Sequence, residues 1–262
     1  MGDRPPETQI HLRHRLLGVP ISVLSLPQVT TIVAGQVRST GGYIGVCNVH
    51  SVITAGRDRD LRHALDNALV NTADGMPLVW ALRLLGYRAA ERVYGQALME
   101  ALLGSSHVSR HFLVGSTDHV QQRLLAHVGE RYPGAEIVGR WVPPFTRGVP
   151  DLPQSVESEI IKSRPDVVWV ALGCPRQEKW MAHHWQSLAP AVLIGVGAAF
   201  DFMAGTMSPA PSWMRSLGLE WLFRLGSEPR RLIWRYLSTN PVFIWRMTTQ
   251  LIRERFKPVE RR

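Results

Sequence analysis

The chain has 262 residues, of which 45% are hydrophobic and 19% charged, and this composition excludes an intrinsically disordered protein. Its length accommodates one large α/β domain, with or without an appendage. The net charge of +9 predicts an anionic partner, which could be a phosphate group, a nucleic acid or an anionic lipid.

The N-terminal segment carries Asp3 and Glu7 and lacks the apolar stretch of a secretory signal, so we expect a cytoplasmic protein. The longest apolar run, residues 189–200, is too short to span a bilayer, because a membrane helix needs about 20 residues. Cys47 and Cys174 have no metal-binding spacing, and we expect two reduced core thiols.

Short apolar runs bounded by turn residues predict strands, and amphipathic runs between them predict helices. The predicted strands are 19–26, 42–48, 111–115, 135–140, 166–172 and 191–196. The predicted helices are 28–38, 58–71, 77–85, 118–131, 151–163 and 178–188. This alternation predicts a parallel sheet with helices on both faces. Because ligands bind beyond the carboxyl ends of such strands, we expect them at the loops after Asn48, Gly115, Gly173 and Gly197.

The alternation stops after about Phe202, and the rest of the chain is expected to be helical, with breaks at Pro229 and Pro241. From Trp213 to Arg262 it has eleven Lys or Arg residues against four acidic ones, a net charge of +7. This composition predicts a basic, Trp-rich helical appendage to the α/β domain.

Two polar residues lie at predicted turns next to apolar segments. Asp74, in the segment Ala73-Asp74-Gly75-Met76-Pro77, precedes a predicted helix and suits either a helix cap or a general base. Asn48 ends an apolar strand and suits either a local turn or a contact with a ligand. From the residues alone we favour the local roles, a helix cap for Asp74 and a turn for Asn48.

Two glycine-rich turns follow predicted strands. Gly173 opens the first, and the backbone N–H groups there precede a helix and can bind an anion. Gly197 lies in the second, where close packing explains the glycines equally well. Neither turn has the spacing of a P-loop or of a GxGxxG dinucleotide fingerprint.

Asp58-Arg59-Asp60 matches the DxD pattern with which many glycosyltransferases hold a divalent metal. The same residues begin a predicted amphipathic helix, where acidic side chains are expected because of the helix dipole. We favour the helix-cap interpretation and predict no metal site.

A series of short motifs occurs in a fixed order along the chain. They are Asn48-Val49-His50, Ala73-Asp74-Gly75-Met76-Pro77, Glu91-Arg92-Val93-Tyr94-Gly95, Pro143-Pro144-Phe145, Gly173-Cys174-Pro175-Arg176-Gln177-Glu178, Gly195-Val196-Gly197-Ala198-Ala199-Phe200-Asp201-Phe202, Gly218-Leu219-Glu220-Trp221 and Glu228-Pro229-Arg230-Arg231. This order resembles the WecG/TagA/CpsF glycosyltransferases over roughly residues 17–240.

The resemblance implies an inverting glycosyltransferase that needs no metal or other cofactor. Its donor would be a UDP-sugar such as UDP-N-acetylmannosamine, and its acceptor a sugar linked to a polyprenyl diphosphate. The implied fold is a single Rossmann-like α/β domain at residues 17–205, after an N-terminal extension at 1–16. Residues 206–262 would form an appendage that docks on the membrane and helps to close the active site. We therefore expect a protein bound peripherally to the inner face of the membrane, with a homo-oligomer left open.

The resemblance also assigns roles to residues. Asp74 would be the catalytic base and Arg92 a residue that contacts phosphate or substrate. The implied donor pocket contains Asn48, Gly173, Gln177 and Gly197, and the implied basic positions for acceptor and phosphate are Arg224, Arg231 and Arg235. The sequence departs from the family pattern at Val46, Ala97 and Pro209, which leaves the donor sugar open.

Two other classes of protein would fit parts of the sequence. A nucleotide-binding oxidoreductase would use the same kind of sheet, but it would need a GxGxxG motif followed by an acid. A nucleic-acid-binding module would use the basic tail, but no helix-turn-helix or RNP-like motif is present. We therefore expect no nucleic-acid partner.

Overall fold

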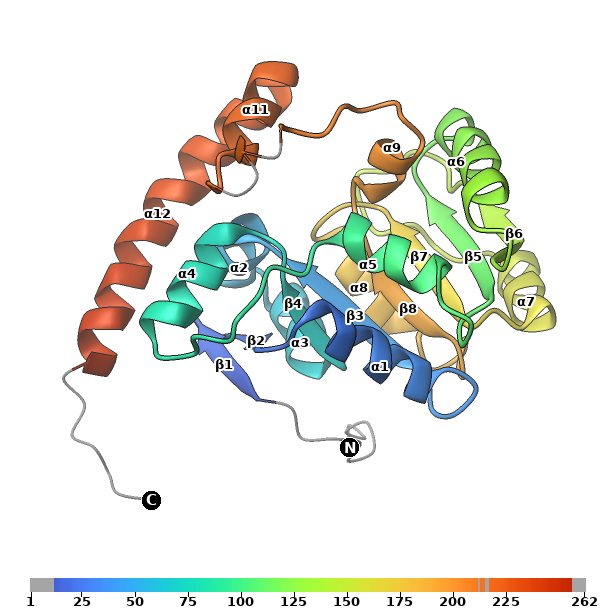
Figure 1. The fold of residues 1–262 in the computed structure, drawn as a ribbon, viewed down its shortest axis with the longest axis horizontal. Coiled ribbons are helices and arrows are strands. Elements are labelled where there is room, and N and C mark those ends of the chain that lie inside the picture. Colours follow the sequence, from blue (N-terminus) through green and yellow to red (C-terminus); the bar gives the residue numbers. More distant parts are fainter. Residues whose placement is uncertain (1–11, 212, 215–216, 256–262) are drawn as a thin grey trace.

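The structure, a computed structural model, describes residues 12–211, 213–214 and 217–255, with the side chain of Arg231 left out. A six-stranded parallel sheet lies at the centre with helices on both faces, as predicted (Figure 1). Its strands are β3 (Gly42–Cys47), β4 (Val70–Ala73), β5 (Arg110–Gly115), β6 (Glu136–Trp141), β7 (Val167–Ala171) and β8 (Val192–Gly195). Before them, β1 (Arg13–Leu16) and β2 (Val19–Ser22) form an antiparallel hairpin.

The helices follow the strands in the alternating pattern of an α/β fold. They are α1 (Leu26–Gln36), α2 (Val49–Ala55), α3 (Arg59–Asn67), α4 (Met76–Leu84), α5 (Gly95–Leu103), α6 (Asp118–Arg131), α7 (Gln154–Ser163), α8 (Arg176–His184), α9 (Ala199–Met203), α11 (Glu220–Ser227) and α12 (Pro229–Arg255). Helices α1, α5, α6 and α9 cover one face of the sheet, while α7 and α8 cover the other. Because both faces are covered, β3, β7 and β8 are almost entirely apolar.

The strands lie in the order β4-β3-β8-β7-β5-β6. All five pairings between neighbours in this order are parallel, so the carboxyl ends of all six strands lie at one edge of the sheet. The adjacent strands β4, β3, β8 and β7 lead into the loops that carry Asp74, Asn48, Gly197 and Gly173. This edge is where a ligand is expected to bind.

The prediction of a helix over 58–71 was wrong in its last four residues. Helix α3 ends at Asn67, and Val70–Ala73 forms β4, which pairs with β3. Leu61 and Leu65 are buried on α3 in the predicted way. Leu69 has the same spacing, but it lies beyond the helix because Ala68 adopts an extended backbone conformation. The four-residue spacing of leucines continues past the end of the helix, so the periodicity did not reveal the short edge strand β4 with its β-branched residues.

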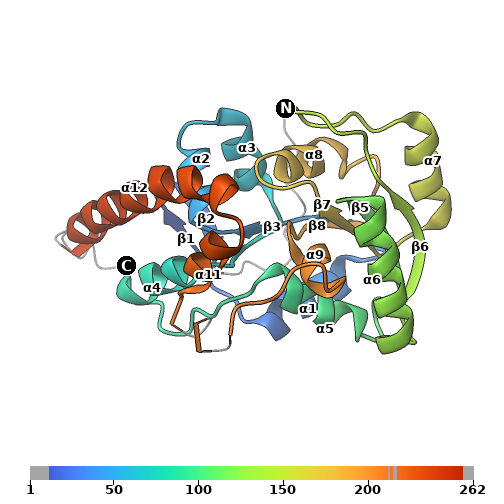
Figure 2. The same cartoon turned by 90° about the horizontal axis from the view of Figure 1, so that it is seen from above.

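The C-terminal segment is helical, as predicted, and α12 lies along α2 and α4 at one end of the molecule (Figures 1 and 2). Pro229 is the first residue of α12, a position that suits proline because its N–H is not needed there. The predicted break at Pro241 was wrong, since Pro241 lies inside α12. Burial of Phe243 and Met247 against the α/β domain holds the helix together past that proline. In the described part of the chain no helix is long and apolar enough to cross a membrane.

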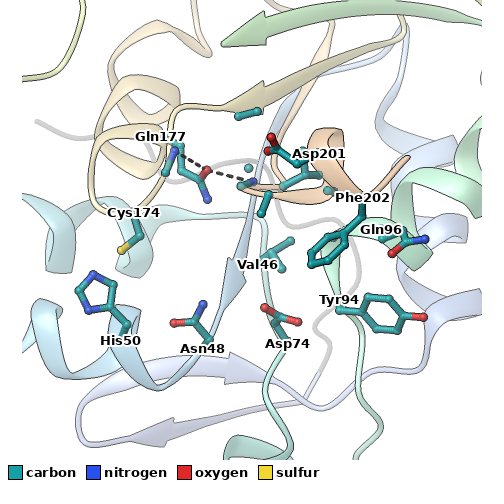
Figure 3. Close-up of a pocket in the computed structure, with 18 of the residues that line it drawn as sticks. Val46, Asn48, His50, Asp74, Tyr94, Gln96, Cys174, Gln177, Asp201 and Phe202 are labelled. Atoms are coloured by element: carbon teal, nitrogen blue, oxygen red, sulfur yellow. Dashed lines mark hydrogen bonds between the residues drawn. The ribbon is translucent and has the colours of Figure 1, made fainter. Parts of the chain in front are cut away.

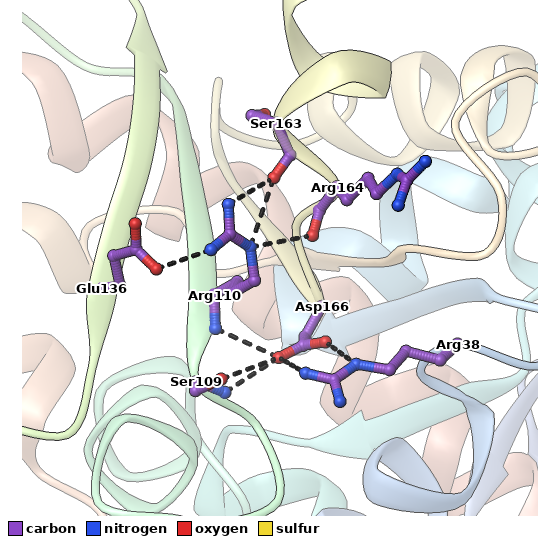
Figure 4. Close-up of polar contacts among 7 residues, drawn as sticks. All are labelled: Arg38, Ser109, Arg110, Glu136, Ser163, Arg164 and Asp166. Atoms are coloured by element: carbon purple, nitrogen blue, oxygen red, sulfur yellow. Dashed lines mark hydrogen bonds and ion pairs between the residues drawn. The ribbon is translucent and has the colours of Figure 1, made fainter.

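At the opposite edge of the sheet, Asp166 joins the segments that enter β5 and β7 (Figure 4). Its carboxylate is 1% exposed and accepts hydrogen bonds from Arg38 at 2.8 Å, from Ser109 N at 2.9 Å and from Arg110 N at 3.0 Å. Burial alone would raise the pKa of Asp166, but these hydrogen bonds outweigh it and lower the pKa below the ordinary value.

Replacing Asp166 by alanine is expected to lower the free energy of unfolding by about 3 kcal/mol at pH 7, because two partly buried N–H groups lose their acceptor. Because the folded-state pKa is depressed, this contribution is present above the ordinary value of 3.8 and is lost as the pH falls through the folded pKa. Urea unfolding of both proteins from pH 7 down to about 3 tests this. Glu136→Ala is the control, since Glu136 is 61% exposed and its ion pair is worth less than about 1 kcal/mol.

Candidate active site

A cavity of about 490 Å³ opens at the carboxyl edge of the sheet (Figure 3). The loops after β3, β4, β7 and β8 form its floor, and residues of α11 and α12 contribute to its rim. Eight of the nine residues predicted for the site line it: Asn48, Asp74, Arg92, Gly173, Gln177, Gly197, Arg224 and Arg235. The ninth, Arg231, lies in α12, but its side chain is outside the described part of the chain.

Asp74 follows β4 directly. Its backbone N donates to the carbonyl oxygen of Cys47 at 2.8 Å, which continues the pairing of the two strands by one residue. The N-cap of α4 is Gly75 and not Asp74, so the helix-cap interpretation of this aspartate is wrong. The Asp74 side chain lines the cavity and is 27% exposed, which leaves it accessible to a ligand.

Arg92 holds the loop that carries Asp74. Its Nε donates to the carbonyl oxygen of Asp74, and its Nη2 lies 3.5 Å from Asp74 Oδ1 and 2.6 Å from Glu220 Oε2. The guanidinium carbon lies 4.6 Å from the centre of the Tyr94 ring, a cation–π distance. Arg92 therefore joins the end of β4 to α11 of the appendage.

The surroundings of Asp74 raise the pKa of its carboxyl group. Burial is the largest cause, the Glu220 carboxylate adds to it, and Arg92 and Arg224 act in the opposite direction. A carboxylate with a raised pKa is a stronger base near neutral pH and suits the removal of a proton from a hydroxyl group.

Asn48 is the N-cap of α2, where its Oδ1 accepts a hydrogen bond from Ser51 N at 3.2 Å. The local-turn interpretation is therefore confirmed. The residue nevertheless lines the cavity beside the end of β3. As the N-cap of α2, Asn48 has its side-chain amide at the N-terminus of that helix, where backbone N–H groups favour anionic ligands.

Gln177 links the two glycine-rich turns. Its Oε1 accepts hydrogen bonds from Gly173 N and from Gly197 N, both at 3.2 Å, and its side chain is buried (Figure 3). Both glycines have positive φ, +75° and +56°, which other residues adopt only with strain. The amide of Gln177 therefore acts mainly by setting the distance between the two turns.

Two further arginines lie at the rim. Arg224 is on α11, with its guanidinium carbon 5.8 Å from the centre of the Phe202 ring, and Arg235 is on α12. Because the chain turns at Glu228, the two arginines are not on one continuous helix, yet both line the cavity. Together with Arg92 they give the cavity guanidinium groups of the kind that bind anionic ligands.

Sequence reasoning missed several residues that line the cavity: His50, Tyr94, Gln96, Asp201, Phe202 and Glu220. In Figure 3, His50 and Cys174 lie on one side of the view, and Tyr94, Gln96 and Phe202 on the other. Burial and then the charge of Arg235 lower the pKa of His50 to about 4, so it is neutral at pH 7. All but Gln96 stand inside the sequence motifs, but no local pattern indicates which motif residues face a common cavity.

The DxD segment lies away from this cavity. Asp58 caps α3 by accepting from Leu61 N at 3.0 Å, which confirms the helix-cap interpretation. Lys179 Nζ lies 2.7 Å from the Asp58 carboxylate and 3.7 Å from that of Asp60. Across residues 12–211, 213–214 and 217–255, no group of three or more His, Cys, Asp or Glu side chains could hold a metal ion.

A parallel α/β sheet with a carboxylate and converging arginines at its carboxyl edge is typical of enzymes that act on anionic substrates. The model of the family described as "Glycosyl transferase WecG/TagA/CpsF family" matches residues 14–257. The chain therefore belongs to this family of glycosyltransferases, which sets aside the oxidoreductase and nucleic-acid alternatives.

Curated relatives agree with this assignment. The N-acetylglucosaminyldiphosphoundecaprenol N-acetyl-beta-D-mannosaminyltransferase of Bacillus subtilis (strain 168) is 33% identical over 209 residues, 79% of this chain and 78% of the relative. The protein of the same name from Bacillus spizizenii (strain ATCC 23059 / NRRL B-14472 / W23) is 30% identical over 79% of each chain. That of Staphylococcus aureus (strain MW2) is 29% identical over 70% of each chain.

Replacing Gln177 by alanine is expected to lower the free energy of unfolding by about 1–3 kcal/mol, because two backbone N–H groups lose their acceptor. Hydrogen exchange at Gly173 and Gly197 should quicken by more than the global loss of stability accounts for. Gln122→Ala, which removes an exposed contact to Asp118, is the control and should change neither quantity. Unaltered exchange at both glycines in Gln177→Ala would show that the amide does not hold the turns.

Proposed function

We propose that this glycosyltransferase moves a sugar from a UDP-sugar to a sugar linked to a polyprenyl diphosphate, with inversion at the anomeric carbon. The observation that carries the proposal is the presence of the Asp74 carboxylate in one cavity with Arg92, Arg224 and Arg235. The names of the relatives describe an N-acetylmannosaminyl group transferred to N-acetylglucosaminyl-diphosphoundecaprenol, and they supply the acceptor class.

The chemistry needs a base and a site for the leaving group. The acceptor oxygen forms a bond to the anomeric carbon while the bond from that carbon to the UDP oxygen breaks. Asp74 takes the proton of the acceptor hydroxyl, and UDP leaves with the electron pair of the broken bond. Arg92, Arg224 and Arg235 offset the negative charge that develops on the diphosphate.

These arginines also support a reaction without a metal ion. In many glycosyltransferases a divalent cation on a DxD motif neutralises the diphosphate, but here Asp58 and Asp60 pair with Lys179 outside the cavity. Guanidinium groups bind phosphate oxygens in pairs and can take over the role of the cation.

The donor sugar is proposed as UDP-N-acetylmannosamine, with other UDP-sugars as alternatives. Two of the three departures from the family pattern, Val46 and Pro209, line the cavity, so they bear on which sugar fits. A homo-oligomer stays a prediction.

The first test is release of UDP from a panel of UDP-sugars, with a polyprenyl-diphosphate-linked sugar as acceptor and EDTA present. Release with one donor, dependent on the acceptor, is expected. Asp74→Asn should keep the fold and lose about 10²–10⁴-fold in kcat, the usual size of a general-base contribution. Near-normal turnover by that variant would remove Asp74 from the mechanism, and activity restored only by Mg²⁺ or Mn²⁺ would contradict the metal-free proposal.

We also propose that α12 binds the anionic inner face of the cell membrane. On its inner side, Leu232 is buried, and Phe243 and Met247 are buried against the α/β domain. Its outer row is apolar and exposed, and consists of Ile233, Trp234, Leu237, Ile244, Trp245 and Ile252. The same helix also carries exposed arginines at positions 230, 246 and 253. Tryptophan with nearby basic residues suits the interface of an anionic bilayer, where a lipid-linked acceptor also lies.

Replacing Trp234 and Trp245 together by alanine is expected to weaken binding to anionic vesicles by about tenfold or more, because each indole loses apolar contact with the interface. Cosedimentation with vesicles of phosphatidylglycerol measures this. Ile161→Ala, which removes an exposed side chain from α7, is the control. Equal sedimentation of the double variant and the unmodified protein would contradict the role of α12.

A further inference from the structure

Glu220 enters the active-site cavity from the appendage. It is the first residue of α11, and its Oε2 lies 2.6 Å from Nη2 of Arg92, although the two residues are 128 positions apart. The side chains of Glu220 and Arg92 are 24% and 17% exposed. A charge-assisted hydrogen bond this short and this sheltered joins α11 to the segment between α4 and α5.

The same nitrogen of Arg92 also faces the catalytic carboxylate, but at a longer distance. Nη2 lies 3.5 Å from Asp74 Oδ1, at the limit of a hydrogen bond. Two carboxylates therefore share one guanidinium nitrogen, and Glu220 has the stronger contact. The Nε of Arg92 stays on the carbonyl oxygen of Asp74, so the guanidinium bridges the loop and the appendage.

The unequal sharing of Arg92 between the two carboxylates affects the strength of Asp74 as a base. A guanidinium paired closely with Asp74 would occupy lone pairs of its carboxylate and make it a weaker base. Glu220 draws Nη2 toward itself, and the Tyr94 ring, 4.6 Å from the guanidinium carbon, limits the other positions that the group can take. After the larger effect of burial, the charge of Glu220 also raises the pKa of Asp74.

We propose that Glu220 is a positioning residue for the transfer reaction, which holds the Arg92 guanidinium so that Asp74 keeps a lone pair for the acceptor proton. This inference rests on the proposed function of the site. Because Glu220 belongs to α11, the base is fully prepared only when that helix is docked at the cavity.

The test uses the full-length chain with Glu220→Gln, which keeps the size of the side chain and removes its charge. The kcat for UDP release is expected to fall by about tenfold to a hundredfold, less than the loss of the base itself. The acid limb of the pH profile of kcat/KM should move to lower pH, because losing the Glu220 charge and freeing Arg92 both lower the pKa of Asp74. The Kd for UDP, measured by calorimetry, should change by less than about twofold.

Two further variants separate this role from a structural one. Glu220→Asp keeps the charge and withdraws the carboxylate by one methylene, so it should leave the acid limb in place and recover part of kcat. Glu254→Gln is the matched control, since Glu254 also pairs the appendage with another part of the chain, β1, where it lies 3.2 Å from His14 Nε2, and it is 27% exposed. It lies outside the cavity lining, so its kcat and pH profile should equal those of the unmodified enzyme.

A folded Glu220→Gln protein with unchanged kcat and an unchanged pH profile would overturn the role of Glu220 and leave the proposed function intact. Tighter binding of UDP by that variant would also overturn it, because Glu220 would then compete with the diphosphate for Arg92. Absence of transfer by the unmodified enzyme with every donor would overturn the proposed function and this inference together. Thermal unfolding of each variant shows whether it is folded under the assay conditions.

Discussion

Parallel pairing of four neighbouring strands is the constraint on which the site depends. Because β4, β3, β8 and β7 all run the same way, the residues after them meet at one edge, although they come from positions as distant as 48 and 197. Gln177 then sets the spacing of two of the loops through hydrogen bonds to Gly173 and Gly197. The cavity is thus built on backbone groups that the sheet itself positions.

Charged groups of both signs in the cavity act in opposite directions on the pKa of Asp74. Burial and Glu220 raise the pKa of that carboxyl group, and Arg92 and Arg224 lower it. The arginines that would bind a diphosphate are therefore the same groups that control the strength of the base. This coupling explains why a site of this kind uses arginines supplied by several elements, since each one can be held at a different distance from the carboxylate.

The appendage completes the cavity and also presents a surface of its own. Helix α11 brings Glu220 and Arg224 to the rim, and α12 brings Arg235 there while its outer row of Ile and Trp side chains remains exposed. Packing of Phe243 and Met247 on the α/β domain holds α12 in place. Pro241 is tolerated within α12 because tertiary packing outweighs the loss of one backbone hydrogen bond.

The sequence by itself determined the α/β class, the order of most strands and helices, and the motifs that carry Asp74, Arg92 and Gln177, because apolar periodicity and turn residues are local signals. Tertiary structure alone decided that β4 is a strand, that Asp74 faces a cavity instead of capping α4, and that Gln177 bridges two turns. It also decided that Glu220 reaches Arg92 across 128 residues. No local pattern encodes such contacts, since they exist only after the parallel sheet has brought distant strand ends to one edge.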